Sequence, residues 1–468
     1  SCRWPPVPGC VTERPMDNRQ TRHEDIHSHR HVHPDNGQML SVEDALDRVL
    51  ALVEPLESSM TALLDADGLT LAEDVVAPFD VPALANSGMD GYAVRATDVL
   101  LATAASEVVL PVVDQIQAGQ IPAGPLPPRA AVRIMTGAPV PDGADAIIPY
   151  ELTDEVERRA GGWSSTEIGI RHAPVAGEHV RPAGEDATLG QMVLPKGRVL
   201  DPPAIGLLAT FGYATVPVVR RPRVAILATG DEVQAPGTTL GPGSLFDSNS
   251  YGIAAAIRRW GAVPHLIGIA RDNMKDLRAK LRKGLEADLL VTSAGVSAGA
   301  FDMVKEVLKE LGTIDFWAVR MRPARPIAFG RLNAAGGRKV PMLGLPGNPV
   351  SALVALIEFG YPAIGKMMGN SAKPLPTVRA ILEDPILNTD SRRVYARVLI
   401  EKRNGTLFAR STGAQGSNIL TSMALAEGLA ICHEDLERRD AGEEVVVQLL
   451  NWRDQFDLLT ESLDITIL

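Results

Sequence analysis

The pattern of hydrophobic and polar positions changes its rhythm three times along the 468-residue chain. Residues 41–56, SVEDALDRVLALVEPL, carry apolar side chains every three or four positions after Ser41, which predicts a helix ending near Pro55. From residue 57 to about 220, short apolar runs are broken by Gly and Pro, as is typical of β modules. After about Pro374 such runs return, which predicts a small C-terminal β domain.

Between residues 223 and 360, strand-like apolar runs alternate with helix-like segments. The predicted strands are RVAILATG (223–230), VPHLIGIA (263–270), DLLVTSAG (288–295) and VPMLGLPG (340–347), with two more strands around residues 320–325. The predicted helices cover residues 250–261, 272–286, 302–312 and 348–360. This alternation predicts a parallel, doubly wound sheet with helices on both faces, so the fold class is α/β and multidomain.

Composition narrows the class of protein. The chain is 45% hydrophobic and 22% charged, as in globular proteins, and its length suits several domains. A net charge of -11 argues against duplex nucleic acid as a partner. Three cysteines cannot form a disulfide framework, and no apolar run reaches membrane-spanning length without Pro, Gly or charge. We therefore expect a cytoplasmic protein without membrane insertion.

Both ends of the chain are predicted to be tails. Residues 1–37 are polar and contain five of the nine histidines, and residues 451–468 form a second candidate tail. His23-Glu24-x-x-His27 spells the zinc-protease pattern, but that pattern needs a rigid helix and a third ligand, and neither is evident. A disordered, solvated tail is the favoured interpretation, and loose metal binding by its histidines stays an open alternative.

Acidic and glycine-rich segments follow the predicted strands. Asp231 and Glu232 come after the first strand, Asp272 after the second, and Asp302 precedes a helix. Ligands of doubly wound sheets bind beyond the carboxyl ends of the strands, and glycine-rich turns that lead into helices bind anions. Because the acids would repel an anion, we expect a divalent cation such as Mg²⁺ between them. Each acid, Asp302 above all, could instead be a helix N-cap.

A short arginine-rich turn gives a second sign of an anionic ligand. FWAVRMRPARPIAFG (316–330) sets Arg320, Arg322 and Arg325 within six positions. Like charges repel, so a solvent-facing turn gains little from this cluster, whereas guanidinium groups grip phosphate and other oxyanions with two bonds. The turn therefore predicts an oxyanion site.

Eight motifs in a fixed order resemble one family. They are NSGMDGYAVR (86–95), RIMTGAPVPDGAD (133–145), GED (184–186), ATGDEV (228–233), FDSNS (246–250), SAGVSAGAFD (293–302), LPGNPVSA (345–352) and TGAQGSNIL (412–420). From about residue 39 to 450 the chain is similar to the MoeA/gephyrin E-domain family of molybdopterin molybdenumtransferases.

The resemblance implies a reaction and an architecture. Family members insert molybdate into adenylylated molybdopterin in a Mg²⁺-dependent step that releases AMP and gives molybdenum cofactor. The implied subunit is elongated and belongs to a homodimer whose active site is shared, and it works beside other enzymes of cofactor synthesis. The implied parts are a MogA-like molybdopterin-binding α/β domain (38–51 and 206–373), a linker-like α+β domain (52–85 and 171–205), an inserted β-rich domain (86–170) and a C-terminal β domain (374–450).

The resemblance also assigns roles to residues. Asp90, Thr136, Asp186, Glu232 and Asp302 match catalytic positions, with Glu232, Asp272 and Asp302 as Mg²⁺ ligands. Substrate-binding positions are Asp272, Ser297, Arg322, Arg325, Pro326 and Ser351, and Arg397 with Ser417 matches molybdate-associated positions.

The chain departs from the family pattern around the expected molybdate site. The family's K-P-G-K-P turn is here Arg322-Pro323-Ala324-Arg325-Pro326, which keeps the charges but replaces lysine and removes a glycine that allows positive φ. Ala318, Ala294 and Ala300 also replace family residues. Two alternatives therefore stay open: a catalytically weakened, gephyrin-like scaffold that binds a linear peptide of a membrane or division protein, and a relative that uses tungstate or a modified pterin.

Overall fold

The structure is a computed structural model that describes residues 39–160, 166–293, 301–371 and 373–450. The two predicted tails and Ser297 lie outside the described residues, as do Ala294 and Ala300.

A six-stranded sheet in the order β15-β12-β16-β20-β19-β17 forms the doubly wound domain. Its strands are β12 (Arg223–Thr229), β15 (Val263–Ala270), β16 (Leu289–Ser293), β17 (Gly312–Ala318), β19 (Pro326–Asn333) and β20 (Lys339–Leu345). Strands β15, β12, β16 and β20 are parallel neighbours, but β19 is antiparallel to both β17 and β20. The expectation of a wholly parallel sheet is thus wrong at this edge, because the short arginine turn between β17 and β19 can join only antiparallel neighbours.

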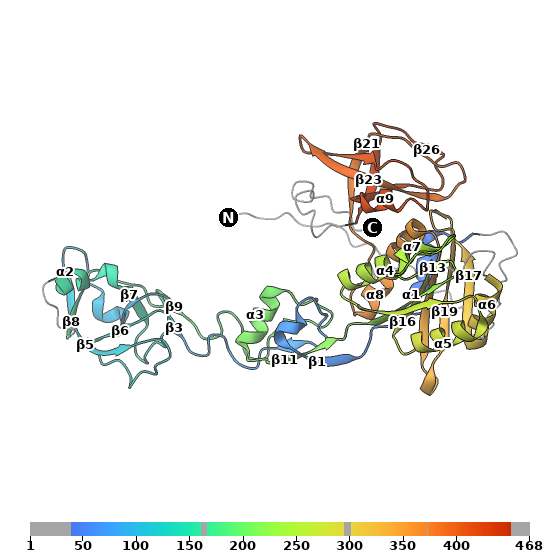
Figure 1. Cartoon of the computed structure of the whole chain (residues 1–468). Coiled ribbons are helices and arrows are strands. Elements are labelled where there is room, and N and C mark those ends of the chain that lie inside the picture. The colour runs from blue at the N-terminus through green and yellow to red at the C-terminus, as the bar shows by residue number, and fades with distance from the viewer. Residues whose placement is uncertain (1–38, 161–165, 294–300, 372, 451–468) are drawn as a thin grey trace, which may run out of the picture. The chain divides into compact units, whose positions relative to one another are not determined.

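Helices cover both faces of this sheet, as predicted. They are α1 (Val42–Leu50), α4 (Ser248–Arg259), α5 (Met274–Gly284), α6 (Phe301–Leu311), α7 (Pro349–Ala355) and α8 (Tyr361–Met367), with a π-helical turn η6 (Leu356–Gly360) joining the last two. Alternate residues of β12 face opposite sides: Val224 and Ile226 pack with α1, α4, α7 and α8, whereas Ala225 and Leu227 pack with α5 and α6. Figure 1 labels these elements on the ribbon.

The stretch Pro349–Met367 is long and apolar enough to cross a membrane, and 78% of it is buried inside the protein. It is a core helix of the doubly wound domain, since Val350, Val354 and Phe359 belong to the same hydrophobic cluster as β12.

A small α+β module is built from two separate chain segments. Strand β1 (Ser58–Ala62) pairs with β11 (Thr215–Val219), and β2 (Val75–Val76) pairs with β10 (Met192–Leu194). The turn η2 (Leu63–Ala66) and helix α3 (Pro202–Thr210), which is capped by Asp201, complete it. Leu71, Leu208 and Val218 lie in its core. The predicted domain boundary at residue 206 falls inside α3.

A five-stranded sheet in the order β7-β4-β6-β5-β8 carries the MDGYAV motif. Its strands are β4 (Gly91–Val94), β5 (Val108–Ile116), β6 (Ala131–Ile134), β7 (Ala146–Pro149) and β8 (Glu167–Ile170). This region also contains two short helical turns, η3 (Ala96–Val99) and η4 (Tyr150–Leu152), and helix α2 (Glu155–Ala160). It is flanked in the sequence by β3 (Asn86–Ser87) and β9 (Val180–Arg181), which pair with each other as a two-stranded ribbon.

The C-terminal domain is a closed β-barrel, drawn in orange to red in Figure 1. Strands β23 (Arg393–Arg403), β24 (Thr406–Ser411), β21 (Thr377–Leu382), β27 (Glu444–Leu449) and β25 (Gly428–Cys432) pair in that order, and β25 pairs back onto β23. A short ribbon of β22 (Ile386–Leu387) with β26 (Arg438–Arg439) and helix α9 (Leu420–Ala424) complete it. Strand β18 (Met321–Arg322), inside the arginine turn, adds a parallel neighbour to β23.

Candidate active site

A cavity of 850 Å³ lies at the carboxyl ends of the parallel strands. Its walls come from the end of β12, the start of α4, the end of β16, the arginine turn, the loop before α7 and residues 415–418 of the C-terminal domain. This is where a doubly wound sheet is expected to bind its ligand. Of the predicted site residues, it brings together Glu232, Arg322, Arg325, Pro326, Ser351 and Ser417.

The acidic side of the cavity begins right after β12. Gly230 has a φ of +127°, which L side chains rarely adopt, so the turn favours glycine. A Cβ there would also come within 2.6 Å of the Glu232 carboxylate, which would have to move. Glu232 is exposed and lines the cavity. Asp231 Oδ1 accepts a hydrogen bond of 3.1 Å from the backbone N–H of Asp272, which brings the ends of β12 and β15 together. Asp272 is exposed but does not line the cavity.

Asn249 joins two strand ends beneath the cavity. Its Nδ2 donates to Ser293 Oγ after β16 and to the carbonyl of Gly347 after β20, both at 2.7 Å. Asp247 caps α4 by accepting from the N–H of Ser250 at 2.9 Å. The FDSNS motif was recognised in the sequence, but no role was predicted for Asn249. The signal that could have predicted one is a polar residue at the start of a helix that follows a strand.

The start of α7 forms the facing wall. Ser351 is buried to 5% exposure and lines the cavity. Asn348 Nδ2 donates to Ser417 Oγ at 3.0 Å, and the N–H of Val350 donates to the Ser417 carbonyl at 3.1 Å. These bonds connect the Pro-Gly-Asn loop of the doubly wound domain to the loop of the C-terminal domain.

The arginine turn supplies the cationic wall. Arg322 lies beside Asp390, with 3.6 Å between Nη1 and Oδ2, and its Nη2 donates to the Leu387 carbonyl. Arg325 is exposed and, within the described part of the chain, its side chain makes no hydrogen bond or ion pair. Ala324 adopts a φ of +78°, so the backbone keeps the left-handed conformation that glycine would permit more easily. Arg325 is therefore the guanidinium most available for a ligand at this wall.

Arg397 lies beside the main cavity and not in it. It lines a neighbouring 380 Å³ cavity that shares Arg322, Pro323 and Gln415 with the larger one. Its guanidinium is buried, with Nε donating to Ser422 Oγ at 2.9 Å and Nη2 to the carbonyls of Ala414 and Gly416 at 3.2 Å. Burial lowers its pKa, since none of these acceptors is a carboxylate. Arg397 thus shapes the loop that carries Ser417.

Asp90 and Thr136 lie together beside the five-stranded sheet and not at the cavity. Asp90 Oδ1 accepts from the backbone N–H of Thr136 at 2.6 Å and from its hydroxyl at 2.8 Å. These bonds hold the pKa of Asp90 below its usual value. Behind them, Glu155 accepts from Tyr92 and Arg133, both at 2.8 Å. Asp90, Thr136 and the exposed Asp186 do not line the cavity.

The predicted Mg²⁺ ligands can be compared with the chemistry that Mg²⁺ requires. Within the described residues, no group of three or more His, Cys, Asp or Glu side chains is arranged to hold a metal ion. Mg²⁺ usually takes one or two carboxylates and fills its sphere with water and phosphate oxygens, so exposed Glu232 and Asp272 fit a substrate-borne ion. Asp302 lies inside the first turn of α6, which begins at Phe301, and its side chain lies outside the described residues.

Comparison with known proteins gives consistent matches along the chain. Family models match residues 40–212 (MoeA N-terminal region, domain I and II), 225–366 (probable molybdopterin binding domain) and 379–450 (MoeA C-terminal region, domain IV). Molybdopterin molybdenumtransferase 2 of Mycobacterium tuberculosis is 39% identical over 416 residues, covering 87% of this chain and 99% of the relative. Molybdopterin molybdenumtransferase of Bacillus subtilis is 33% identical over 413 residues, 88% of this chain and 94% of the relative.

A solved structure gives the same match in three dimensions. The molybdopterin biosynthesis MoeA protein of Pyrococcus horikosii superposes with a TM-score of 0.75 at 31% identity, covering 88% of this chain and 99% of that one.

Proposed function

Because the chain belongs to the molybdopterin molybdenumtransferase family, we propose that it inserts molybdate into adenylylated molybdopterin, with Mg²⁺-dependent release of AMP, to form molybdenum cofactor. The observation that carries this proposal is the 850 Å³ cavity, which combines a carboxylate, two helix starts and a cationic turn at one sheet edge. An adenylylated, phosphate-bearing substrate and a tetrahedral oxyanion both need such a wall.

The described residues divide the work of binding between two walls. The start of α4 offers backbone N–H groups to phosphate oxygens, and Ser351 of α7 adds a hydroxyl. The first N–H groups of α7 are not part of this wall, because Pro349 has none and Val350 donates to the Ser417 carbonyl. Arg322 and Arg325 hold molybdate from the opposite wall, with Ser417 beside them. Glu232 and Asp272 would hold Mg²⁺, whose charge would offset that of the phosphate groups.

The same proposal explains why two candidate acids and a threonine lie outside the cavity. Asp90, Thr136 and Asp186 reach the substrate from a second copy of the chain, so that the active site is shared in a homodimer. Tying the carboxylate of Asp90 to the Thr136 backbone fixes its direction and favours its charged form. Such a group suits a role in orienting water or a proton at the scissile phosphate bond.

Mixed dimers test this arrangement directly. Asp90→Asn and Arg325→Ala subunits are mixed by partial unfolding and refolding or by co-expression, and assayed at a molybdate concentration that saturates the wild type but leaves each variant homodimer with little activity. One active site of each mixed dimer then has both halves intact, so random pairing should restore about a quarter of the wild-type rate. Absence of any recovery, with mixed dimers demonstrated by mass spectrometry, contradicts a shared site.

The primary test is turnover. Purified protein is incubated with adenylylated molybdopterin, Mg²⁺ and molybdate, and AMP release and cofactor formation are followed together. We expect both, with tungstate competing for molybdate. Tight adenylate binding without turnover would contradict the proposal and favour the peptide-binding scaffold, which no described feature supports and which the transferase names of the relatives do not favour.

We place this chemistry in the cytoplasm, beside the other enzymes of cofactor synthesis. The small number of cysteines and the burial of the apolar helix Pro349–Met367 support this part of the proposal.

A further inference from the structure

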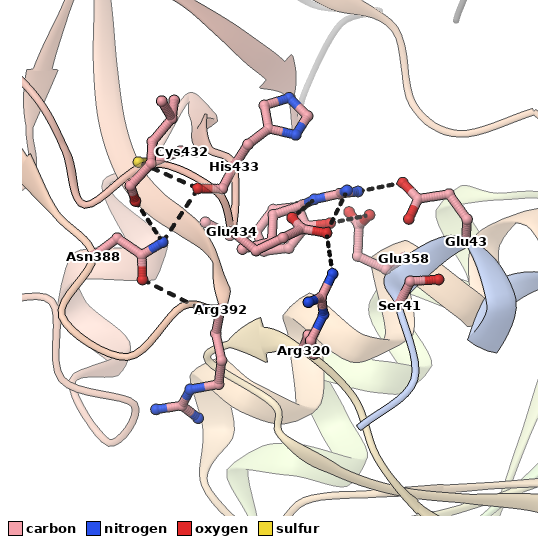
Figure 2. Close-up of polar contacts among 12 residues, drawn as sticks. Ser41, Glu43, Arg320, Glu358, Asn388, Arg392, Cys432, His433 and Glu434 are labelled. Carbon is pink, nitrogen blue, oxygen red and sulfur yellow. Dashed lines mark hydrogen bonds and ion pairs between the residues drawn. The ribbon is translucent and has the colours of Figure 1, made fainter. Parts of the chain in front are cut away.

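Four charged residues away from the cavity join three parts of the chain (Figure 2). They are Glu43 of α1, Arg320 of the arginine turn, and Arg393 and Glu434 of the C-terminal barrel, here called the Glu434 cluster. Glu434 accepts from Arg393 at 2.9 and 3.2 Å and from Arg320 at 3.4 Å. Arg393 also donates to Glu43 at 2.5 Å. The cluster is electrically balanced, with two cations and two anions.

The backbone brings these side chains together. The N–H of Arg393 donates to the carbonyl of Arg320, and the N–H of Arg320 donates to the carbonyl of Leu40, both at 2.8 Å. Strand β18 therefore lies between the segment before α1 and strand β23 of the barrel. The arginine turn is hydrogen-bonded on both sides by segments distant in sequence.

Glu434 and Arg393 form the buried part of the cluster, whereas the side chains of Arg320 and Glu43 are 39% and 62% exposed. Glu434 is 9% exposed, and the Arg393 side chain is 12% exposed. Burial alone would raise the pKa of Glu434, but its hydrogen bonds and the neighbouring arginines outweigh this effect and hold the pKa below its usual value. Buried charges of this kind fix a geometry, because any displacement leaves one of them unpaired.

The cluster is linked to the cavity by the short segment Arg320–Arg322. Met321 is fully buried, Arg320 is the bend residue just before β18, and Arg322 is the second residue of β18. Arg320 contacts Glu434, whereas Arg322 lines the cavity and contacts Leu387 and Asp390 of the barrel. No member of the Glu434 cluster lines the cavity itself.

We propose that Glu434 is a positioning residue for the oxyanion: by holding Arg320 and Arg393 together, it fixes the arginine turn so that Arg322 and Arg325 face the ligand. This inference rests on the proposed function, which gives those two arginines molybdate as ligand. It predicts that loss of the Glu434 charge weakens the oxyanion site selectively. If Glu434 only stabilised the contact between the domains, its loss would lower the melting temperature without changing the KM for molybdate more than the KM for the adenylate.

The chain contains a matched control at the opposite end of the sheet. Asp288, just before β16, accepts two bonds of 2.7 Å from Arg220 and is similarly buried. Asp288→Asn breaks a comparable buried ion pair at the start of β16, at the end of the sheet opposite the arginine turn. Glu434→Gln and Asp288→Asn should therefore have similar costs in melting temperature but different effects on molybdate.

The experiment measures KM for molybdate and for adenylylated molybdopterin, with melting temperature, for the wild type and both variants. For Glu434→Gln we expect the molybdate KM to rise about tenfold, with the adenylate KM within twofold. Asp288→Asn should leave both constants near wild type. Glu434→Asp, which keeps the charge, should recover part of the molybdate KM, and it serves as the readout if Glu434→Gln does not fold.

A double-mutant cycle with Arg320→Met tests the route of the effect. If Glu434 acts through Arg320, the double variant should have a molybdate KM close to that of the worse single variant. Fully additive effects, an unchanged molybdate KM in Glu434→Gln, or an equal rise in Asp288→Asn would overturn the inference. If wild-type turnover does not depend on molybdate, the proposed function itself is wrong. This result differs from one in which the wild type depends on molybdate but Glu434→Gln does not change its KM, which would reject only the role of Glu434.

Discussion

The two halves of the proposed active site are built in opposite ways. The cationic half collects Arg322, Arg325 and Ser417 from segments almost a hundred residues apart, held together across the doubly wound domain and the barrel. The acidic half depends on one local bond pattern, in which Thr136 grips Asp90 beside a buried ion pair. The difference teaches that the cationic half depends on how two domains are joined, whereas the acidic half is an intrinsic property of one small sheet.

The largest expected effect is on the acidic half. Asp90→Asn should lower kcat by roughly 100- to 10,000-fold, because the carboxylate is the charged group that this half offers to the reaction. Melting temperature should stay within a few degrees, since Asp90 is exposed and asparagine still accepts from Thr136. AMP release by the purified variant is the measurement. A variant with near-wild-type turnover would remove the acidic half from the mechanism.

The next largest effect is on the cationic half. Arg325→Ala should weaken molybdate binding by about 1.5–3 kcal/mol, the usual contribution of a charge-assisted hydrogen bond. Calorimetric titration with molybdate measures it without the second substrate. Arg325→Lys is the control, because it restores the family's charge and should recover most of the affinity. An unchanged affinity in Arg325→Ala would show that the oxyanion binds elsewhere.

A pH-dependent effect of comparable size concerns the junction that the cationic half needs. Burial raises the pKa of Glu358 to about 7, although the Tyr395 hydroxyl of the barrel donates to the carboxylate at 3.0 Å and Gln448 also acts to lower the pKa. Because the folded state keeps this proton when the unfolded state has lost it, the stabilising contribution of Glu358 should be complete below pH 4.5 and be lost as pH rises to about 7. The wild type should lose about 3 kcal/mol over this range relative to Glu358→Gln, which cannot titrate. Denaturant unfolding at a series of pH values checks it, and parallel curves for the two proteins would refute it.

The smallest expected effect concerns the turn backbone. Ala324→Gly should remove the cost of a positive φ, about 1 kcal/mol, less the loss of one buried methyl group. We expect a slight gain in stability and a molybdate KM equal to or lower than that of the wild type. A clear loss of stability would mean that packing of the Ala324 methyl outweighs the backbone strain.

The sequence predicted the elements whose signal is local. The alternation between residues 223 and 360 correctly gave the strands and helices of the doubly wound domain, because every strand there is a short apolar run. It did not give the reversed direction of β19, since the same apolar pattern suits either direction of a buried strand. The sequence also did not predict that β25 pairs with β23 to close the barrel, because strand pairing depends on contacts between residues distant in the sequence.

For the site as well, the sequence predicted what depends on local residue types and not what depends on contacts between distant segments. The roles of Glu232, Arg322 and Arg325 followed from residue types beside strand ends, and these residues line the cavity. The placement of Arg397 in the neighbouring cavity did not, because its carbonyl and hydroxyl acceptors come from a loop that no local pattern relates to it. Asn249 and Glu434 were missed because their bonding partners are distant in the sequence: Ser293 and Gly347 for Asn249, and Arg320 and Arg393 for Glu434.

The pairing of β18 with β23 sets a limit on how this protein can be recombined with its relatives. A chimera that takes only the barrel from another family member exchanges one strand of a hydrogen-bonded pair and leaves the other behind. The arginine turn and the first residues of β23 therefore form a single exchangeable unit, although about seventy positions of the chain separate them. Crossover points that keep this unit intact should yield active hybrids more often than points placed in the connection before the barrel.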